Sequence, residues 1–465
     1  MMQADAALTA VTRFGLGPKP HDIARIRSDP RGYVRDQCFV DGAAIPDDPA
    51  LMDHDTLRQA FRNAQLPFRE AVRTLRDATD DNREMLEAAR QALAQDRRDM
   101  RRGIQEAEIG GRFRHGATTD NPFVERLVLF WSNHFTVNFR MGIVLAVTTG
   151  LFEREAIRAN VLGYFEDMLS TAVLHPAMLN YLDNQRSIGP NSRAGRRRGN
   201  VKVNENLARE VLELHTLGVN GGYTQDDVVE LALALTGWRG GFSARERSPA
   251  FARRWHEPGY RTVLGKTYPA GGADQVRPIL ADLAKHPATA KHLAGKLARH
   301  FVGDTASQAL IADLETAYRD TGGDLREMAI VLAEHEDAWT PPPAKTVPPY
   351  DFMVATARAT GVNDVPVQFI RQASRAMAHE IWSAPSPAGW PDADNAFLGG
   401  DSLLERVDFA RAFSRRYATT RDVKGLADSL YGDLLDPFLE EAIVRAEDHY
   451  QGLVLLLMSP TFHRR

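Results

Sequence analysis

The sequence predicts a mostly α-helical protein, consisting of a large multi-helix domain with one small inserted β-hairpin. Apolar residues recur at helical spacing through most of the chain, and helix start signals precede several of these runs. Residues 249–268 form the one convincing β-hairpin candidate. With 465 residues and 43% hydrophobic content, the chain is long and apolar enough to bury a large core.

The centre of the domain is expected to consist of three helices, at residues 123–137, 205–217 and 225–237. Before the first, Asn121 is a capping residue and Pro122 occupies the first helical position. The run that follows is apolar almost all round, so this helix must be internal. Thr224 and Asp227 fit a capping box variant at the start of the third helix, which is also largely apolar.

The middle helix carries a polar stripe. At about 100° per residue, one arc of it holds the side chains of Asn206, Arg209, Glu210, Glu213 and Thr216. His215 falls on the opposite, apolar side, roughly 140–160° from the two glutamates, so it cannot share a metal ion with them. We therefore expect His215 to pack in the core with its side chain hydrogen-bonded. Gly218 stands where a left-handed helix end is needed.

The apolar helix at 123–137 leaves Arg126 without a solvent-exposed face, and a buried guanidinium needs a partner. Glu210 or Glu213 is the predicted partner, and the stripe is expected to face Arg126 or Asn133 rather than water. A lone histidine among apolar residues, such as His134, is more often a hydrogen-bonded core residue than a ligand. The candidate catalytic residues are Glu210, Glu213, Arg209, Arg126, Asn206 and His134.

A basic loop at residues 186–202 directly precedes the stripe. No apolar residues anchor its arginines, so we expect it to be mobile in the free protein. Placed over the carboxylates, it would act as an anion-binding lid. The candidate anion-binding residues are Arg193, Arg196, Arg197 and Arg198. The candidate metal ligands are Glu210, Glu213 and His256, and the residues leave the identity of any cofactor unknown.

Two functional hypotheses fit these residues. In the first, the protein is a scaffold or binding protein in which the charged side chains form a buried ion network. In the second, it is an enzyme, with or without a metal ion, whose carboxylate-lined cleft lies beneath the basic loop and near His256. No P-loop, dinucleotide, nucleophile-elbow or zinc-protease motif is present in the sequence, so the reaction class stays open.

A second charged region, residues 55–108, is strongly helix-favouring and contains few aromatic residues. Asp80, Asp81 and Asn82 are expected to break it into a helical hairpin. Such an arm is either a solvated excursion or a surface that binds a partner or a second copy of the chain.

The remaining organisation follows from turn residues and prolines. The β-hairpin at 249–268 is expected to turn at Pro258 and Gly259. Residues 1–340 are predicted to form the main helical domain. After a proline-rich stretch, residues 350–465 are predicted to form a C-terminal helical portion packed on that domain.

Composition narrows the functional class. A net charge of −4 and a pI near 6.4 argue against a general nucleic-acid-binding protein. The single cysteine, Cys38, excludes internal disulfides and multi-cysteine metal sites. No apolar run approaches the roughly 20 residues of a membrane span, and no apolar signal segment precedes the first helix. The expectation is a soluble cytoplasmic protein.

Several short segments, spread from one end of the chain to the other, form a recognisable set. They include Phe130–Phe135, Ala177–Asn184, Asn204–Glu210, Leu235–Trp238, Ala388–Pro391 and Leu457–Phe462. In this order they resemble the bacterial family called domain of unknown function 1800, over the whole chain. The resemblance supplies no catalytic residues. It implies a protein partner, because family members often neighbour a protein with a twin-arginine export signal, and co-export by attachment to such a partner would follow.

Overall fold

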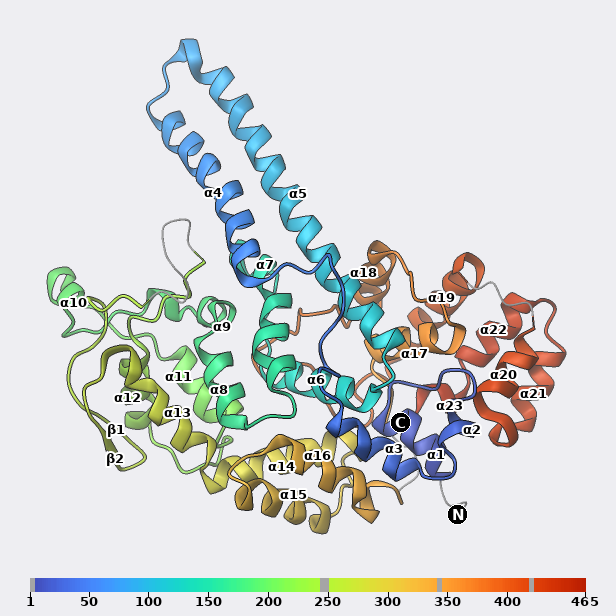
Figure 1. Ribbon diagram of the computed structural model, residues 1–465. Coiled ribbons are helices and arrows are strands. Elements are labelled where there is room, and N and C mark those ends of the chain that lie inside the picture. Colours follow the sequence, from blue (N-terminus) through green and yellow to red (C-terminus); the bar gives the residue numbers. More distant parts are fainter. Residues whose placement is uncertain (1–4, 243–250, 341–344, 418–421) are drawn as a thin grey trace.

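A computed structural model describes residues 5–242, 251–340, 345–417 and 422–465. It is mostly α-helical, and the described residues contain one two-stranded antiparallel sheet, which confirms the predicted fold class. The first helices are α1 (Ala6–Thr9), α2 (Asp22–Ile26), α3 (Pro30–Asp36), α4 (His54–Arg76) and α5 (Asp80–Thr118). In Figure 1, α4 and α5 project from the body as a long hairpin.

The middle of the chain builds most of the body. Its helices are α6 (Pro122–His134), α7 (Ile143–Phe152), α8 (Phe165–Leu174), α9 (Pro176–Tyr181), α10 (Arg193–Arg198), α11 (Asn206–Glu210), α12 (Gln225–Leu235), α13 (Val276–Ala284), α14 (Pro287–Phe301), α15 (Gln308–Asp320) and α16 (Leu325–Glu334). The two strands are β1 (Arg261–Val263) and β2 (Lys266–Tyr268). The C-terminal helices are α17 (Pro349–Thr360), α18 (Val367–Ala376), α19 (Gly400–Tyr417), α20 (Val423–Tyr431), α21 (Pro437–Val444), α22 (His449–Leu457) and α23 (Pro460–His463).

The helix predicted at 123–137 is α6, and it is internal as expected. Phe123, Val128 and Phe135 on or beside it have no exposed surface. Pro122 occupies its first turn, and the helix ends at His134. Because α6 is covered on nearly all sides, every polar side chain it carries needs a partner within the fold.

One hydrophobic core runs through the molecule, from Ala7 to Phe462. Across the proline-rich stretch, α17 is tied to the end of α5 because the Arg358 guanidinium donates to the Gly116 and Thr119 carbonyl oxygens. Residues 341–344 of that stretch lie outside the described residues. The division of the chain at 340–350 stays a prediction.

The charged arm is a helical hairpin, but it bends three residues before the predicted break. α4 ends at Arg76 and α5 begins at Asp80. Asp80 and Asp81 start a helix rather than interrupt one, because acidic side chains are favourable in a first turn, near the positive end of the helix dipole. The base of the arm has a small core of its own, centred on Leu57, Phe61 and Ile104.

The β-hairpin is present but shorter, and the predicted turn is wrong. β1 and β2 pair in antiparallel register, with Thr262 opposite Thr267. The turn is made by Leu264 and Gly265, with φ of 49° and 75°. Two-residue hairpin loops need positive φ at both central residues, and Leu264 gives no sequence signal for that. The first residues of the predicted segment, 249 and 250, lie outside the described part of the chain.

The polar-stripe helix begins as α11 and then widens into a π-helical turn at Val211–His215. The Leu217 amide donates to the Leu212 carbonyl oxygen, which is the i to i+5 bond of that turn. Gly218 follows with φ of 80°, as a left-handed helix end requires. At α12 the capping box is confirmed, with Thr224 and Asp227 each accepting the other's backbone N–H.

Candidate functional site

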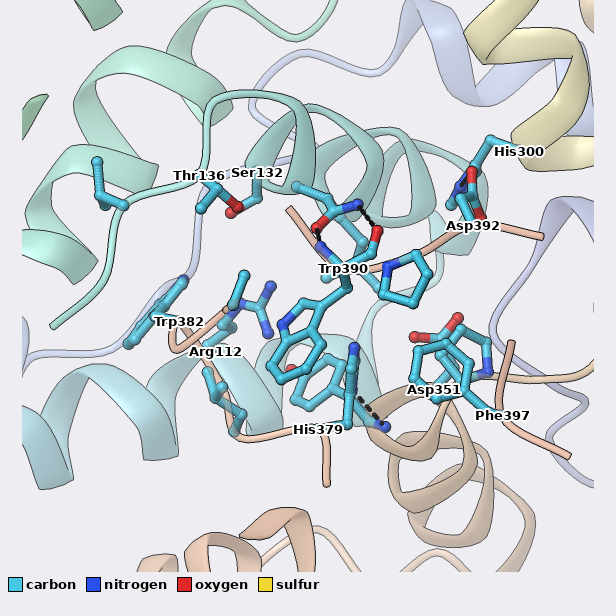
Figure 2. A pocket seen from close by; sticks show the side chains of 18 residues that line it. Arg112, Ser132, Thr136, His300, Asp351, His379, Trp382, Trp390, Asp392 and Phe397 are labelled. Carbon is cyan, nitrogen blue, oxygen red and sulfur yellow. Dashed lines mark hydrogen bonds and ion pairs between the residues drawn. The ribbon is translucent and has the colours of Figure 1, made fainter. Parts of the chain in front are cut away.

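A cavity lies between α5, α6, α17 and the segment 379–397 that follows α18. Its volume is about 90 Å³. The lining combines charged, aromatic and hydroxyl side chains, including Arg112, Ser132, Asn133, Thr136, His300, Tyr350, Asp351, His379, Trp382, Trp390, Asp392 and Phe397. Figure 2 shows these side chains converging from several elements. Four elements far apart in the sequence therefore build one site.

One wall is held by α6. The Asn133 side chain accepts the Trp390 backbone N–H at 2.7 Å and donates to the Trp390 carbonyl oxygen at 3.0 Å. Gly389 has φ of 84°, and a Cβ there would lie 2.5 Å from the Asn133 carbonyl oxygen. This position therefore needs glycine. Two segments singled out in the sequence, Phe130–Phe135 and Ala388–Pro391, thus meet at the cavity.

A buried carboxylate, Glu153, organises the opposite wall. It accepts hydrogen bonds from Arg112 Nε at 2.9 Å, Ser132 Oγ at 2.7 Å and Trp382 Nε1 at 2.8 Å. Arg158 also binds it, at 2.8 Å. Burial alone would raise the pKa of Glu153. The positive charges of Arg112 and Arg158 outweigh burial and lower this pKa to about 2. Glu153 is therefore an anion that fixes the wall.

Arg112 presents the rest of its guanidinium to the cavity. Its Nε is used by Glu153, whereas its two outer nitrogens make no hydrogen bond to any described residue. The group lies 4.4 Å from the Tyr350 ring centroid and 5.3 Å from that of Trp382. In the view of Figure 2 it stands between Trp382 and Trp390. It is a positioned cation between aromatic walls.

His379 supplies a second donor. Its Nδ1 accepts the Tyr350 backbone N–H at 3.3 Å, so the neutral ring carries its proton on Nε2. That Nε2–H has no hydrogen-bond partner in the described part of the chain. The ring packs 4.8 Å from Trp390 and 5.1 Å from Phe397. Burial lowers the pKa of His379 to about 4, so the ring is neutral at pH 7.

The floor of the cavity holds an unsatisfied polar group. The Tyr350 hydroxyl is buried and has no hydrogen-bond partner among the described residues. Burial raises the pKa of this hydroxyl, so it stays protonated. Unsatisfied buried groups are few in native proteins, and a functional role is one explanation for them.

The two acidic residues of the cavity are already paired. Asp351 binds Arg126 at 2.9 Å. Asp392 binds Lys345 at 2.9 Å and His300 Nδ1 at 3.0 Å. Burial raises the pKa of Asp392, but His300 and Lys345 lower it well below its ordinary range. The two aspartates are therefore already paired, whereas Arg112, His379 and the Tyr350 hydroxyl each keep a donor without a hydrogen-bond partner among the described residues.

The predicted partner of Arg126 is wrong. Arg126 is buried as expected, but it pairs with Asp351 and donates to the Gly15 and Thr12 carbonyl oxygens. Asn133 binds Trp390 instead of the polar stripe. Asp351 lies 225 residues after Arg126 in the sequence. No local sequence pattern could therefore identify it as the partner of Arg126.

The polar stripe does not form an internal ion network. Asn206 is exposed, and Arg209, Glu210 and Glu213 are partly exposed. Arg209 binds Glu205, which precedes the helix, at 3.0 Å. Burial and the neighbouring Glu213 together raise the pKa of Glu210. The stripe is therefore a separate surface feature, and the structure does not bring it to the cavity of Figure 2.

The predictions for the two histidines hold in part. His215 is buried, as expected for a packing residue, but its Nδ1 has no hydrogen-bond partner among the described residues. His134 is buried too, and its Nε2 donates to the His215 carbonyl oxygen at 3.1 Å. Aromatic rings surround it, with Phe135 at 4.6 Å and Trp131 at 5.3 Å.

The candidate metal ligands Glu210, Glu213 and His256 do not gather. No group of three or more His, Cys, Asp or Glu side chains in the described ranges is arranged to hold a metal ion. His256 Nδ1 lies 2.9 Å from the Thr236 carbonyl oxygen, and Glu213 accepts from Tyr223 at 3.4 Å. His256 and Glu213 therefore each have a partner of their own.

The basic loop is more structured than expected. It contains α10, and backbone bonds join Gly189 to Trp255 and Ala194 to Arg254. Glu257 accepts both the backbone and side-chain N–H groups of Asn191, at 2.8 and 2.7 Å. An open hollow of about 530 Å³ lies beside it, lined by Arg193, Ala194, Arg197, Arg198, Arg254 and Trp255. Of the four predicted anion-binding arginines, three line this hollow and Arg196 does not.

Sequence reasoning missed Arg112, Glu153, His379 and Asp392. Arg112 was missed because α5 continues ten residues past the predicted arm, and most of its buried residues lie in that continuation. A signal was available, because three glycines close this helix, at 110, 111 and 116. A Cβ at Gly110 would lie 3.0 Å from Val367, which is the close packing that helical glycines often serve.

The fold and cavity define a mostly α-helical protein with an aromatic-walled, ion-lined cavity. The model of the family described as "Protein of unknown function (DUF1800)" matches residues 9–464, and the chain belongs to this family. No curated protein and no solved structure matches it. Of the helices in the described part of the chain, none is both long and apolar enough to cross a membrane.

Proposed function

We propose that the protein binds a small carboxylate with a flat apolar part in the cavity between α5, α6, α17 and residues 379–397. The observation that carries this proposal is the outer edge of the Arg112 guanidinium, which makes no hydrogen bond to any described residue and lies between aromatic rings. A guanidinium edge matches the two oxygens of a carboxylate.

The rest of the cavity supports the same ligand class. His379 adds an N–H donor, and the rings of Trp382, Trp390 and Phe397 offer flat apolar walls. One water molecule needs about 10–15 Å³ of cavity volume. The cavity of about 90 Å³ therefore has room for roughly six to nine water-sized groups. That suits a small ring with one carboxylate rather than a large cofactor.

This proposal develops the hypothesis of a binding protein with a buried ion network. The network consists of Arg112, Glu153, Arg158 and Glu125, which are joined by bonds of 2.6 to 2.9 Å. It fixes Arg112 before any ligand arrives, so little side-chain entropy is lost on binding.

Benzoate and benzylamine test the proposal, because they share a ring and differ in charge. We expect benzoate to raise the thermal unfolding midpoint and to quench tryptophan fluorescence, while benzylamine does neither. Arg112→Lys keeps a cation beside Glu153 but loses the guanidinium edge, and should weaken benzoate binding about tenfold or more. Arg102→Lys is the matched control, on the same helix and at the surface.

Equal binding of benzylamine, or an unchanged benzoate affinity in Arg112→Lys, would reject this assignment. His379→Asn supplies an independent check, because it removes the Nε2–H but keeps an acceptor for Tyr350. It should lower benzoate affinity while its effect on folding is measured separately by urea unfolding.

A second candidate function is anion binding at the basic hollow, which its volume and four arginines favour. There the loop would serve the polar stripe, as in the enzyme hypothesis with Glu210 and Glu213. Inorganic phosphate should bind, and Arg197→Gln should weaken it. Arg196→Gln, on the same short helix but outside the hollow, should not.

A further inference from the structure

Four basic side chains converge where α6, the π-helical turn and α14 meet. They are His134, His215, His292 and Lys296. The ring centroids of His134 and His215 are 5.8 Å apart, and those of His134 and His292 are 6.4 Å apart. This cluster is not used by the proposed carboxylate site. Its composition is unusual because no acid belongs to it.

The hydrogen bonds fix the roles of the atoms. A carbonyl oxygen can only accept, so the bond from His134 Nε2 to the His215 carbonyl oxygen places the ring proton on Nε2. His134 Nδ1 is then a bare acceptor, and it lies 3.0 Å from Lys296 Nζ. Lys296, His134 and the His215 carbonyl form a line of nucleophile, base and orienting group.

The surroundings make the Lys296 ammonium easier to deprotonate than an exposed one. No ion pair joins Lys296 to a carboxylate in the part of the chain that the structure describes. Burial lowers the pKa of Lys296 to about 8, with Asp392 opposing and Arg299 adding to this shift. Burial and Lys296 also lower the pKa of His134 well below its ordinary value, so this imidazole is neutral and free to accept a proton.

Lys345 is a buried lysine of the same protein whose ammonium group is fully hydrogen-bonded. Its Nζ binds Asp392 at 2.9 Å and donates to two carbonyl oxygens, of Arg299 and Asp392. All of its hydrogen-bonding capacity serves the fold. Lys296, by contrast, has one hydrogen bond among the described residues, to the histidine that can deprotonate it.

Lys296 lies beside the cavity of Figure 2. It keeps part of its surface exposed, and His300, one turn further along the same face of α14, lines that cavity. Phe130 packs against both His134 and His300, with ring centroids 6.4 and 5.2 Å away. The cavity lining includes His300 and not Lys296, so a small molecule reaches Lys296 through the part of its side chain that is exposed.

We propose that Lys296 is a nucleophile that forms a Schiff base with a small aldehyde or α-keto acid, with His134 as the base that frees its amine. The proposal does not depend on carboxylate binding at Arg112. It rests on the Lys296–His134–His215 geometry and on the lack of an acidic partner for Lys296 among the described residues.

The step balances with the groups present. His134 Nδ1 takes one proton from the Lys296 ammonium. The amine nitrogen then bonds to the carbonyl carbon as the C–O π bond breaks, and one N–H proton of that nitrogen passes to the oxygen, which gives a neutral carbinolamine with a hydroxyl group. The protonated His134 then returns its proton to that hydroxyl, which leaves as water. The product is a protonated imine, and His134 is neutral again.

Glyoxylate with sodium cyanoborohydride tests this on the intact protein, because reduction turns each imine into a stable carboxymethyl-lysine. At pH 7.5 we expect Lys296 to be modified about tenfold or more faster than exposed lysines, since each pKa unit changes the free amine fraction by about ten. Lys291, exposed on the same helix, is the internal reference. Peptide mass spectrometry reads both sites from one sample.

A histidine variant separates base catalysis from simple accessibility. His134→Gln keeps an acceptor and a donor but cannot take up a proton, so Lys296 labelling should slow about tenfold while Lys291 is unaffected. Thermal unfolding establishes that the variant is folded. Labelling of Lys296 no faster than Lys291 in the wild-type protein overturns the proposal, whatever the variants do.

Discussion

Several buried charges in this molecule pair with residues far away in the sequence. Losing one member of such a pair destabilises the fold, because the other member stays buried and charged. Arg126 and Asp351 are the clearest example, with 1% and 6% of their surfaces exposed. Both side chains are almost fully buried, so neutralising one leaves the other as an unpaired ion in a low-dielectric interior.

Arg126→Met should therefore destabilise the protein by about 3–5 kcal/mol. Urea unfolding measures this, and adding Asp351→Asn should restore part of the loss because the stranded charge disappears. Arg445→Met breaks an exposed pair with Glu441 and should cost less than about 1 kcal/mol. Equal losses in Arg126→Met and Arg445→Met would show that the buried pair contributes nothing special.

The buried histidines predict acid sensitivity. Burial lowers the pKa of His379 to about 4 from an ordinary 6.5, and other histidines behave alike, namely His215, His300 and His463. The unfolded chain binds a proton near pH 6.5 and the folded one only near pH 4. Stability is thus complete above pH 6.5 and falls as the pH drops towards 4.

His379→Asn should reduce that pH slope by up to about 1.4 kcal/mol per pH unit between pH 6 and 4.5. Urea titrations at several pH values give the slope. His21→Asn, at an exposed residue with φ of 68° that asparagine tolerates, should leave the slope as it is. An identical slope in wild type and His379→Asn would mean that His379 titrates normally.

At the scale of helices and strands, the sequence predicted what local chemistry specifies. The α6 start at Pro122 and the Thr224–Asp227 capping box are read from neighbouring residues, and both are present. The hairpin turn was misplaced because Leu264 adopts a left-handed conformation that its neighbours impose. The cavity was missed because Arg112 and His379 are brought together only by packing of segments distant in sequence.

The end of the polar-stripe helix offers a matched test of backbone strain. Gly218 and Gly222 have φ of 80° and 84°, but a Cβ at Gly218 would lie 2.9 Å from His292 Nδ1, whereas Gly222 faces open space. Gly222→Ala should cost about 1–2 kcal/mol, from the left-handed backbone alone. Gly218→Ala should cost more, because His292 must also move. Equal unfolding free energies would show that the contact with His292 is not constraining.

For the whole molecule, the continuous core predicts a single cooperative unfolding transition. Val228 of α12 and Leu430 of α20 belong to the same buried cluster, on opposite sides of the proline-rich stretch. Ion pairs such as Arg126 with Asp351 also cross it. Pulsed hydrogen exchange with mass spectrometry in urea should give one midpoint for peptides 225–235 and 423–431. Two separate midpoints would instead divide the chain into independent domains.

Helix α5 connects the tip of the arm directly to the cavity. One uninterrupted helix runs from Asp80 at the tip to Arg112 at the cavity, a span of roughly 48 Å at about 1.5 Å per residue (Figure 1). Between these two ends, Ile104 of α5 packs with Leu57 and Phe61 of α4 in a small core, which holds the helix against the body. A protein bound at the tip would therefore be mechanically coupled to Arg112 through one continuous helix. By the same coupling, a molecule bound at Arg112 would influence the orientation of the tip.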